Sequence, residues 1–220
     1  MRLYEAKQRI DRLANIPFKE YLNPAVFQDT MLKLNKGRTG QLLELTIGLN
    51  LSNTTLDFED GELKTNKCDR FGNPLETMFI TQTASIMDEL LSNKNFCQTK
   101  LYAKLQHLLY VPISKDGPQS DWMFLPCIEV DLSNPLYREL RIQLENDYYD
   151  ICGQFNNMLQ TSPTAMLHTA SGKFIQIRTK DSKPYRPIYS EIYKRYVSDK
   201  NRAFYFKKDF MRYITALQNK

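Results

Sequence analysis

Cysteine is scarce in this sequence of 220 residues, and its four cysteines form no CxxC pair. Closely paired cysteines are the usual ligands of a structural zinc ion, so their absence argues against such a site. The four residues, Cys68, Cys97, Cys127 and Cys152, lie 25 to 30 positions apart. We expect free thiols in a reducing cytosol.

Long apolar runs are also missing, and none approaches the roughly 18 residues that a membrane-spanning helix needs. The N-terminal stretch MRLYEAKQRIDRL carries charge throughout and lacks the apolar core of a signal peptide. With only 8 glycines and 10 prolines, the composition argues against a long disordered linker. These absences lead us to expect a globular cytoplasmic protein with no membrane partner.

Charge is distributed unevenly along the chain. The net charge is +5, but residues 173–220 hold 13 Lys and Arg against 4 acids, a net charge of +9, whereas the first 172 residues have a net charge of −4. Phosphate contacts dominate affinity for nucleic acids, so the basic segment indicates a polyanionic partner. The alternative is a solvated basic tail, but ten interleaved aromatic residues indicate a folded segment.

The hydrophobic pattern predicts a mixed α/β class without regular βαβ repetition. We expect helices over residues 2–15, 38–49, 84–94, 134–158 and 188–197, and a final helix near the C-terminus. We expect strands over residues 62–65, 75–82, 104–113, 122–130 and 173–179. Residues 17–24, PFKEYLNP, are predicted to be an irregular connection.

The stretch DFEDGELKT, residues 57–65, places four acids and a lysine in nine positions. In a strand, Glu62 and Lys64 point to the same side while Leu63 points into the body, and Asp57 can reach that side from the preceding segment. Converging carboxylates suit a hard cation such as Mg²⁺, and an adjacent ammonium group can orient a water or stabilise charge on a phosphate. An acidic surface turn is the alternative, because the pattern is short.

Several longer blocks accompany this motif in a fixed order. They are LNKGRTGQLLELTIGLN, LDFEDGELKTNKCDRFGNPLETMFIT, HLLYVPI, GKFIQIRTK and RAFYFKKDFM. Together, from about residue 34 to about residue 214, they resemble the MutH family of DNA endonucleases. That family includes the mismatch-repair nicking enzyme and restriction endonucleases that cut GATC.

The resemblance implies a restriction-endonuclease-like fold, in which a central mixed sheet is flanked by helices and two lobes surround a DNA cleft. Residues 1–220 would then form a single domain, with a catalytic lobe over about residues 1–115 and a DNA-recognition lobe, basic at its C-terminal end, over about residues 116–220. The implied cofactor is Mg²⁺, which Mn²⁺ can replace. The implied location is the prokaryotic cytosol or nucleoid.

The resemblance also assigns the catalytic residues. Asp57, Glu62 and Lys64 match the family's two acids and lysine, and Glu44 in GQLLE matches its helix-borne carboxylate. The expected metal ligands are therefore Asp57, Glu62 and Glu44. Glu59 and Asp60 compete with Asp57 for its position.

A further family lysine lies on the strand before the VPI-like stretch. Its aligned position is Gln106, and Lys104, two residues earlier and expected on the same strand face, is the substitute candidate. His107 is more often structural than catalytic in such a setting.

Six residues are expected to contact DNA. Arg178, Thr179 and Lys180 match the loop that enters the groove, where they contact either guanine edges or phosphates. Tyr205 matches an aromatic residue near the adenine that is associated with sensing methylation, and Lys207 and Lys208 are expected to bind phosphates.

The resulting expectation is a Mg²⁺-dependent type II restriction endonuclease acting on duplex DNA, with GATC as the target. One alternative is a mismatch-repair nickase that needs an activating protein partner. Another is a non-catalytic DNA-binding effector domain, against which the intact Glu62-Leu63-Lys64 motif speaks. The oligomeric state is left open.

Overall fold

The computed structural model describes residues 1–22, 38–49, 56–161, 169 and 172–218. Within them, helices and two β-sheets confirm the mixed α/β class. The chain forms two compact units that are interleaved in sequence. Unit 1 comprises residues 1–76, 107–131 and 214–220, and unit 2 comprises residues 77–106 and 132–213. The predicted division into functional lobes near residue 115 stays a prediction.

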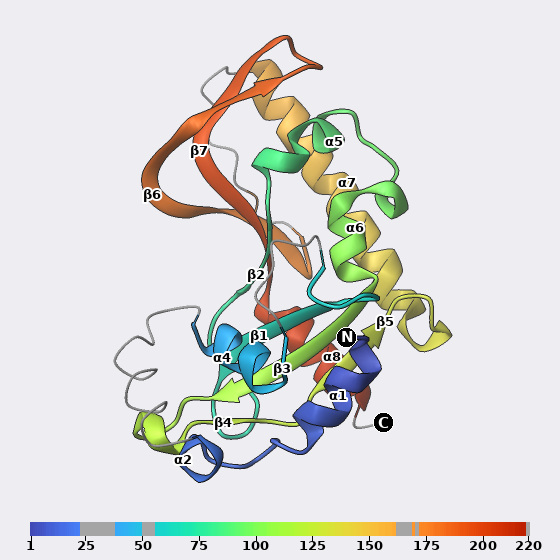
Figure 1. The fold of residues 1–220 in the computed structure, drawn as a ribbon. Helices are drawn as coiled ribbons and strands as arrows, with labels where there is room; N and C mark the ends of the chain where they lie inside the picture. Colours follow the sequence, from blue (N-terminus) through green and yellow to red (C-terminus); the bar gives the residue numbers. More distant parts are fainter. Residues whose placement is uncertain (23–37, 50–55, 162–168, 170–171, 219–220) are drawn as a thin grey trace. The chain divides into compact units, whose positions relative to one another are not determined.

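Unit 1 is built on a sheet in which β1 runs parallel to β3, and β3 pairs antiparallel with both β4 and β5 (Figure 1). The strands are β1 (Glu62–Cys68), β3 (His107–Ser114), β4 (Met123–Phe124) and β5 (Ile128–Asp131). The helices are α1 (Leu3–Asp11), α2 (Phe18–Tyr21) and α4 (Arg38–Thr46). The predicted 62–65 strand is thus confirmed and extended, whereas residues 122–130 form two short strands.

The core of unit 1 joins one face of this sheet to α1 and α4. Leu63 and Val111 from the strands cluster with Leu3 and Ile10 of α1 and Leu43 of α4. Since side chains alternate along a strand, Glu62 and Lys64 project away from the side of Leu63. The predicted direction of Leu63, into the body, is confirmed.

Unit 2 contains the antiparallel sheet β2-β7-β6, drawn in Figure 1 with β6 and β7 as a long curved hairpin. Its strands are β2 (Met78–Gln82), β6 (Ile175–Ser190) and β7 (Arg195–Phe206). Its helices are α5 (Met87–Leu91), α6 (Lys100–Leu105) and α7 (Arg138–Thr161), and α8 (Lys208–Gln218) follows β7. The predicted long helix at 134–158 is confirmed, with α7 starting after a short 3-10 turn at Pro135–Tyr137.

Three predictions of local structure are wrong. Residues 188–197 form the end of β6, a turn and the start of β7, where Lys194 adopts a left-handed conformation with φ of 50°. Residues 104 and 105 are the last two residues of α6, not part of a strand. Thr99 caps the N-terminus of this helix by accepting from the Tyr102 N–H, and β3 begins only at residue 107. Residues 18–21 form α2, where an irregular connection was expected.

No helix in the described ranges combines the length and apolar character needed to cross a bilayer.

Candidate active site and nucleic-acid surface

The centre of the candidate active site is a buried ion pair at the start of β1. Lys64 Nζ lies 2.5 Å from Glu62 Oε1 and also donates to the Leu63 carbonyl at 3.2 Å. Only 2% of Glu62 is exposed. The two side chains therefore share one side of the strand, as the sequence predicted. A buried carboxylate of this kind depends on its partner, because removing a charge from water is costly.

Asp57 is brought to the same place by a tight turn. Phe58 N–H donates to the Gly61 carbonyl at 2.9 Å, which reverses the chain just before β1. Asp57 Oδ2 then accepts from the Leu63 N–H at 2.9 Å. The turn leaves no space for a side chain at Gly61, since a Cβ there would lie 2.8 Å from the His107 carbonyl and 2.6 Å from Leu3 Cδ1. The short spacing between Asp57 and Glu62 is thus compatible with their convergence.

The two competing acids are bound at the start of α1. Asp60 Oδ1 accepts from the Leu3 N–H at 2.8 Å. Glu59 Oε1 lies 2.9 Å from the N-terminal amine of Met1, and its other oxygen lies 3.8 Å from Arg2 Nε. These contacts favour Asp57 over Glu59 and Asp60 as the second acid of the cluster.

Glu44 enters the cluster from α4. The helix approaches β1 closely at Gly40, where a Cβ would lie 3.1 Å from Thr65 Oγ1. Burial raises the pKa of the Glu44 carboxyl above its usual value, and the negative charge of Asp57 raises it further. Lys64 lowers this pKa and Glu62 raises it. Glu44 therefore lies within the electrostatic field of all three residues that the sequence grouped.

The chemistry of this cluster suits a divalent cation, although its geometry is not that of a preformed site. Glu44, Asp57 and Glu62 offer carboxylate oxygens, the donors that Mg²⁺ prefers, and their mutual repulsion is what a cation would relieve. In the part of the chain that the structure describes, no three His, Cys, Asp or Glu side chains are close enough together to hold a metal ion. Binding would therefore require side-chain rearrangement.

Lys104 does not lie where the sequence predicted it, whereas His107 has contacts of the structural kind expected for it. Lys104 lies on α6 in unit 2, so its predicted place on a strand face is wrong. His107 is in unit 1, where Nδ1 lies 2.9 Å from the Asp60 carbonyl and Nε2 lies 3.1 Å from Glu129 Oε1. It connects the 57–61 turn to β5, which agrees with the structural role expected for it.

A second cluster, in unit 2, combines two cations with the exposed ring of Phe79 and the half-buried ring of Tyr205 on the β2-β7-β6 sheet. The Arg178 guanidinium lies 5.8 Å from the centre of the Tyr205 ring, and its Nη1 donates to Thr77 Oγ1 at 3.0 Å. Phe79 packs edge-on against Tyr205, with ring centres 5.8 Å apart. Lys180 Nζ lies 5.0 Å from the centre of the Phe79 ring. We call Phe79, Arg178, Lys180 and Tyr205 the cation–aromatic cluster.

Strand register explains this arrangement. Phe79 and Gln176 both pair with Tyr205, so the three lie in one row across the sheet. Arg178 is two residues beyond Gln176 on the same strand face, and Thr179 points to the other face by alternation. Arg178, Thr179 and Lys180 are all exposed. The sheet therefore presents Arg178 and Tyr205 together, but not Thr179 with them.

The two C-terminal lysines differ from each other in their surroundings. Lys207 Nζ donates to the Gly172 carbonyl at 2.6 Å, and its backbone N–H donates to Phe174. It thus holds the beginning of β6 in addition to the phosphate contact expected of it. Lys208 is the first residue of α8 and is partly exposed.

Asp147 of α7 holds the same strand start from the other side. It is 1% exposed, and its carboxylate accepts from the N–H groups of Lys173, Phe174 and Ile175 at 2.6 to 3.0 Å. The sequence analysis missed both Asp147 and Phe79. An acid within the apolar stripe of a helix, between Leu144 and Tyr148, was the available signal for Asp147. Phe79 alternates with buried Met78 and Ile80, which marked it as an outward-facing ring.

Comparison with known proteins adds no relative: no family model matches the chain, and no curated protein sequence matches it.

Proposed function

We propose that this chain is a Mg²⁺-dependent, sequence-specific endonuclease that hydrolyses phosphodiester bonds in duplex DNA, acting as a type II restriction endonuclease at GATC in the prokaryotic cytosol or nucleoid. The observation that carries the proposal is the Glu62–Lys64 pair, with Lys64 Nζ 2.5 Å from Glu62 Oε1 and Asp57 hydrogen-bonded to the backbone between them. The resemblance of the ordered sequence blocks to the MutH family supports the same activity. A restriction-endonuclease-like fold with a DNA cleft is part of the proposal.

Asp57 and Glu62 would hold the cation through carboxylate oxygens, assisted by Glu44. When bound, Mg²⁺ supplies Lewis-acid stabilisation of charge on the scissile phosphate. Lys64 keeps an ammonium group against Glu62, where it orients the attacking water and stabilises negative charge as the phosphate is attacked. In-line attack would leave a 5′ phosphate and a 3′ hydroxyl.

The cation–aromatic cluster supports DNA binding by unit 2. Arg178 is exposed and has a fixed orientation, because Thr77 accepts from one end of its guanidinium. An arginine presented in this way suits bidentate contact with guanine, and Tyr205 and Phe79 supply apolar surface beside it. Lys180 adds a cation for a phosphate.

Digestion of a supercoiled plasmid containing GATC sites tests the proposed activity. With Mg²⁺ and no added protein, the purified chain should produce linear fragments whose ends map to GATC and carry 5′ phosphates, and EDTA should stop the reaction. Substrates methylated on one, both or neither strand then show the response to methylation strand by strand. Nicked circles alone would point to the mismatch-repair nickase, which waits for an activating partner. The proposal is overturned if the chain does not cut duplex DNA.

A second candidate is DNA binding without cleavage. The observation that favours it is the cation–aromatic cluster, whose contacts lie within unit 2 and involve none of the carboxylates of unit 1. Specific retention of GATC duplexes with no Mg²⁺-dependent cutting would establish it.

Binding by the cation–aromatic cluster is tested with Arg178→Gln and, as a matched control, Arg212→Gln. Arg212 is an exposed arginine of α8 in unit 2, paired only at the surface with Asp209. Loss of a bidentate base contact lowers affinity by about 10-fold or more and relaxes the preference at one base pair. If Arg178 contacts a phosphate instead, Arg178→Gln should weaken binding to all DNA sequences equally. It should also reduce the slope of log affinity against log salt concentration by about one. Equal affinities for the two variants would remove Arg178 from the interface.

A further inference from the structure

Unit 2 contains a hollow of about 550 Å³ that the proposed recognition residues do not line. One wall is the end of β6, and the other is the segment that follows β2. The lining residues are Gln82, Ala84, Ser85, Arg186, Pro187, Ile188 and Tyr189. We call this hollow the hairpin pocket.

The lining chemistry fits a phosphate group. Arg186 is the charged residue of the lining, and Gln82, Ser85 and Tyr189 supply polar side chains of the types that contact DNA phosphates. Arg186 is exposed and forms no ion pair with a residue that the structure describes. None of the lining residues is acidic, so an anion entering the pocket meets no like charge there.

Two acids close to the pocket in sequence, Asp88 and Glu191, are already engaged. Asp88 accepts from Ser190 Oγ at 2.7 Å and from the Glu191 N–H at 3.1 Å. Glu191 in turn pairs with Lys194 at 2.8 Å. These contacts fix the turn of the hairpin.

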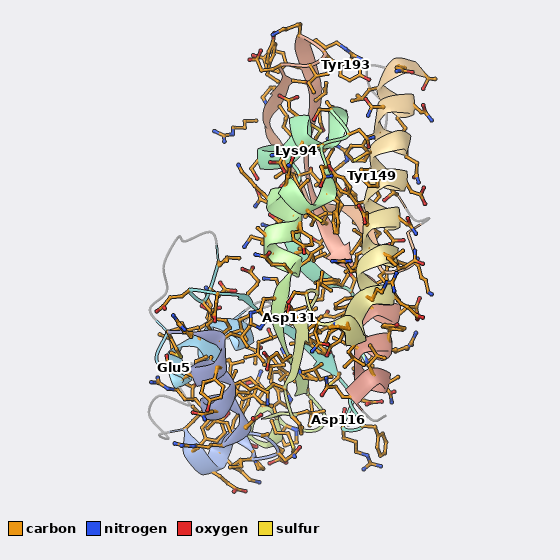
Figure 2. The ribbon with its side chains drawn as sticks, turned by 90° about the vertical axis from the view of Figure 1, so that its right-hand side faces the viewer. Glu5, Lys94, Asp116, Asp131, Tyr149 and Tyr193 are labelled. Carbon is orange, nitrogen blue, oxygen red and sulfur yellow. The ribbon has the colours of Figure 1, made fainter. Side chains whose placement is uncertain are left out.

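Hydrogen bonds also connect the end of the β6–β7 hairpin to α7, so the pocket is preorganised. Tyr193, labelled in Figure 2, donates its hydroxyl to Asn156 Oδ1 at 2.9 Å. Arg195 Nη2 donates to the Leu159 carbonyl at 2.7 Å. Ligand binding to a surface held in this way loses less conformational freedom than binding to a mobile loop.

Two exposed tyrosines, Tyr189 in the pocket lining and Tyr196 outside it, widen this surface. Tyr189 is 45% exposed and Tyr196 is 64% exposed, and they pair across the hairpin with ring centres 5.4 Å apart. A tyrosine hydroxyl is a frequent donor to DNA backbone oxygens. Tyr196 on β7 therefore adds a donor to those of Arg186 and Tyr189 on β6.

The distance between Arg178 and the hairpin pocket determines which part of a bound DNA duplex the pocket can contact. At about 3.3 Å per residue, the eight steps along β6 from Arg178 to Arg186 span at most about 26 Å. Register shifts bend the hairpin between them and shorten this span. One turn of B-DNA is about 34–36 Å, so the pocket lies within one turn of any base that Arg178 contacts.

From this geometry we infer that the hairpin pocket binds a backbone phosphate of duplex DNA outside the recognition sequence, within one helical turn of it. The inference rests on the proposed function, since it assigns a second contact to the same substrate. Its consequence is an affinity that depends on the length of flanking DNA but not on its sequence.

Fluorescence anisotropy with two duplexes tests the inference, with Ca²⁺ in place of Mg²⁺ to prevent cutting. Both duplexes carry GATC and are closed by hairpin caps. The short duplex has three base pairs on each side of GATC, and the long duplex has fourteen on each side. The wild-type protein should bind the long duplex about fivefold more tightly, and Arg186→Gln should abolish that advantage while leaving the short duplex unaffected. For Arg186→Gln, the slope of log affinity against log salt concentration should be shallower than for the wild type by about 0.9 on the long duplex, and unchanged on the short one.

Two further variants separate the pocket from general effects. Tyr189→Phe keeps the ring and removes one donor, so it should lose part of the length advantage, whereas Arg212→Gln should lose none. Melting curves verify that each variant is folded. The inference is overturned if Arg186→Gln keeps the advantage, or if it weakens both duplexes equally. Equal wild-type affinity for both lengths overturns the inference alone, whereas failure of the wild-type protein to bind either duplex overturns the proposed function as well.

Discussion

Glu62 is a nearly inaccessible carboxylate whose charge is matched by Lys64. Neither charge would be tolerated at that position alone, because desolvation of a single buried ion costs several kcal/mol. The arrangement concentrates negative charge: Asp57 and Glu62 both raise the pKa of Glu44, and Lys64 offsets only part of this effect. In the absence of a cation, the site therefore carries an electrostatic penalty.

That penalty predicts the behaviour of Glu44→Gln. The folded protein binds the Glu44 proton more tightly than the unfolded chain does, since burial and Asp57 raise the folded-state pKa. This destabilisation of the folded state is absent below pH 4.5, the pKa of Glu44 in the unfolded chain. It grows as the pH rises from there through the raised folded-state pKa, and it is complete above that pKa. Without a divalent cation at pH 7, Glu44→Gln should melt at a higher temperature than the wild type, and it should cut DNA more slowly.

Thermal melts across pH check this prediction. The difference between the variant and the wild type should shrink as pH falls toward 4.5, and Mg²⁺ should raise the melting temperature of the wild type more than that of the variant. A variant that melts below the wild type at pH 7 without cation would show that Glu44 carries no such penalty.

At the scale of elements, the turn before β1 is the feature that places Asp57 beside Glu62. Its tightest point is Gly61, which lies against the first carbonyl of β3. Gly61→Ala forces the turn and the strand apart, so we expect a loss of about 1–3 kcal/mol in unfolding free energy and a marked loss of cleavage. Urea unfolding and cleavage assays measure the two effects.

Gly153 provides the matched control for that substitution. It lies in α7 with nothing within 4 Å of an added Cβ. Gly153→Ala should therefore stabilise the protein by about 0.5–1 kcal/mol and leave cleavage intact. If Gly61→Ala behaves like Gly153→Ala, the turn does not position the acids.

Asp147 has the corresponding role for β6 in unit 2. Asp147→Ala leaves three backbone N–H groups at the strand start without their acceptor, and each buried donor costs about 1–3 kcal/mol. We expect a loss of at least about 3 kcal/mol in unfolding free energy and faster hydrogen exchange at residues 173–175. Asp150→Ala, at an exposed position of the same helix, should change stability by less than about 0.5 kcal/mol. Unchanged exchange in Asp147→Ala would contradict the anchoring role.

Local patterns predicted most elements but failed where pairing between distant segments decides the structure. The sequence pattern of residues 173–179 predicted a strand, and residues 175–179 form the first part of β6. Residues 188–197 are a different case, because Ile188, Ile192 and Tyr196 recur every four residues, a spacing typical of a helix. The Asp88 contacts to Ser190 and Glu191 lie about 100 residues away in sequence, so no local signal showed the turn.

The same distinction applies to the candidate site. The side shared by Glu62 and Lys64 follows from strand geometry alone. The place of Glu44 was expected only from the resemblance of GQLLE to the MutH family. The roles of Glu59 and Asp60 were not predictable, because they depend on where the start of α1 meets the turn. The helical position of Lys104 was missed because an apolar run near a strand gives no clear boundary.

At the scale of the whole molecule, the acidic cluster belongs to unit 1, and the cation–aromatic cluster belongs to unit 2. Most of the basic segment, residues 173–213, also lies in unit 2. The charge asymmetry along the sequence thus corresponds largely to a division between two compact units. Such a division is suited to an enzyme in which one part holds a cation and the other holds a polyanion.

The most direct test of the central claim is the single-turnover cleavage rate of a GATC duplex, with protein in excess and Mg²⁺ present, for the wild type, Glu62→Gln and Glu59→Gln. Glu59 is an exposed acid three residues away that contacts the N-terminus. We predict that Glu62→Gln lowers the rate by on the order of 10³-fold and that Glu59→Gln keeps it. A folded Glu62→Gln protein that cuts at the wild-type rate would contradict the account.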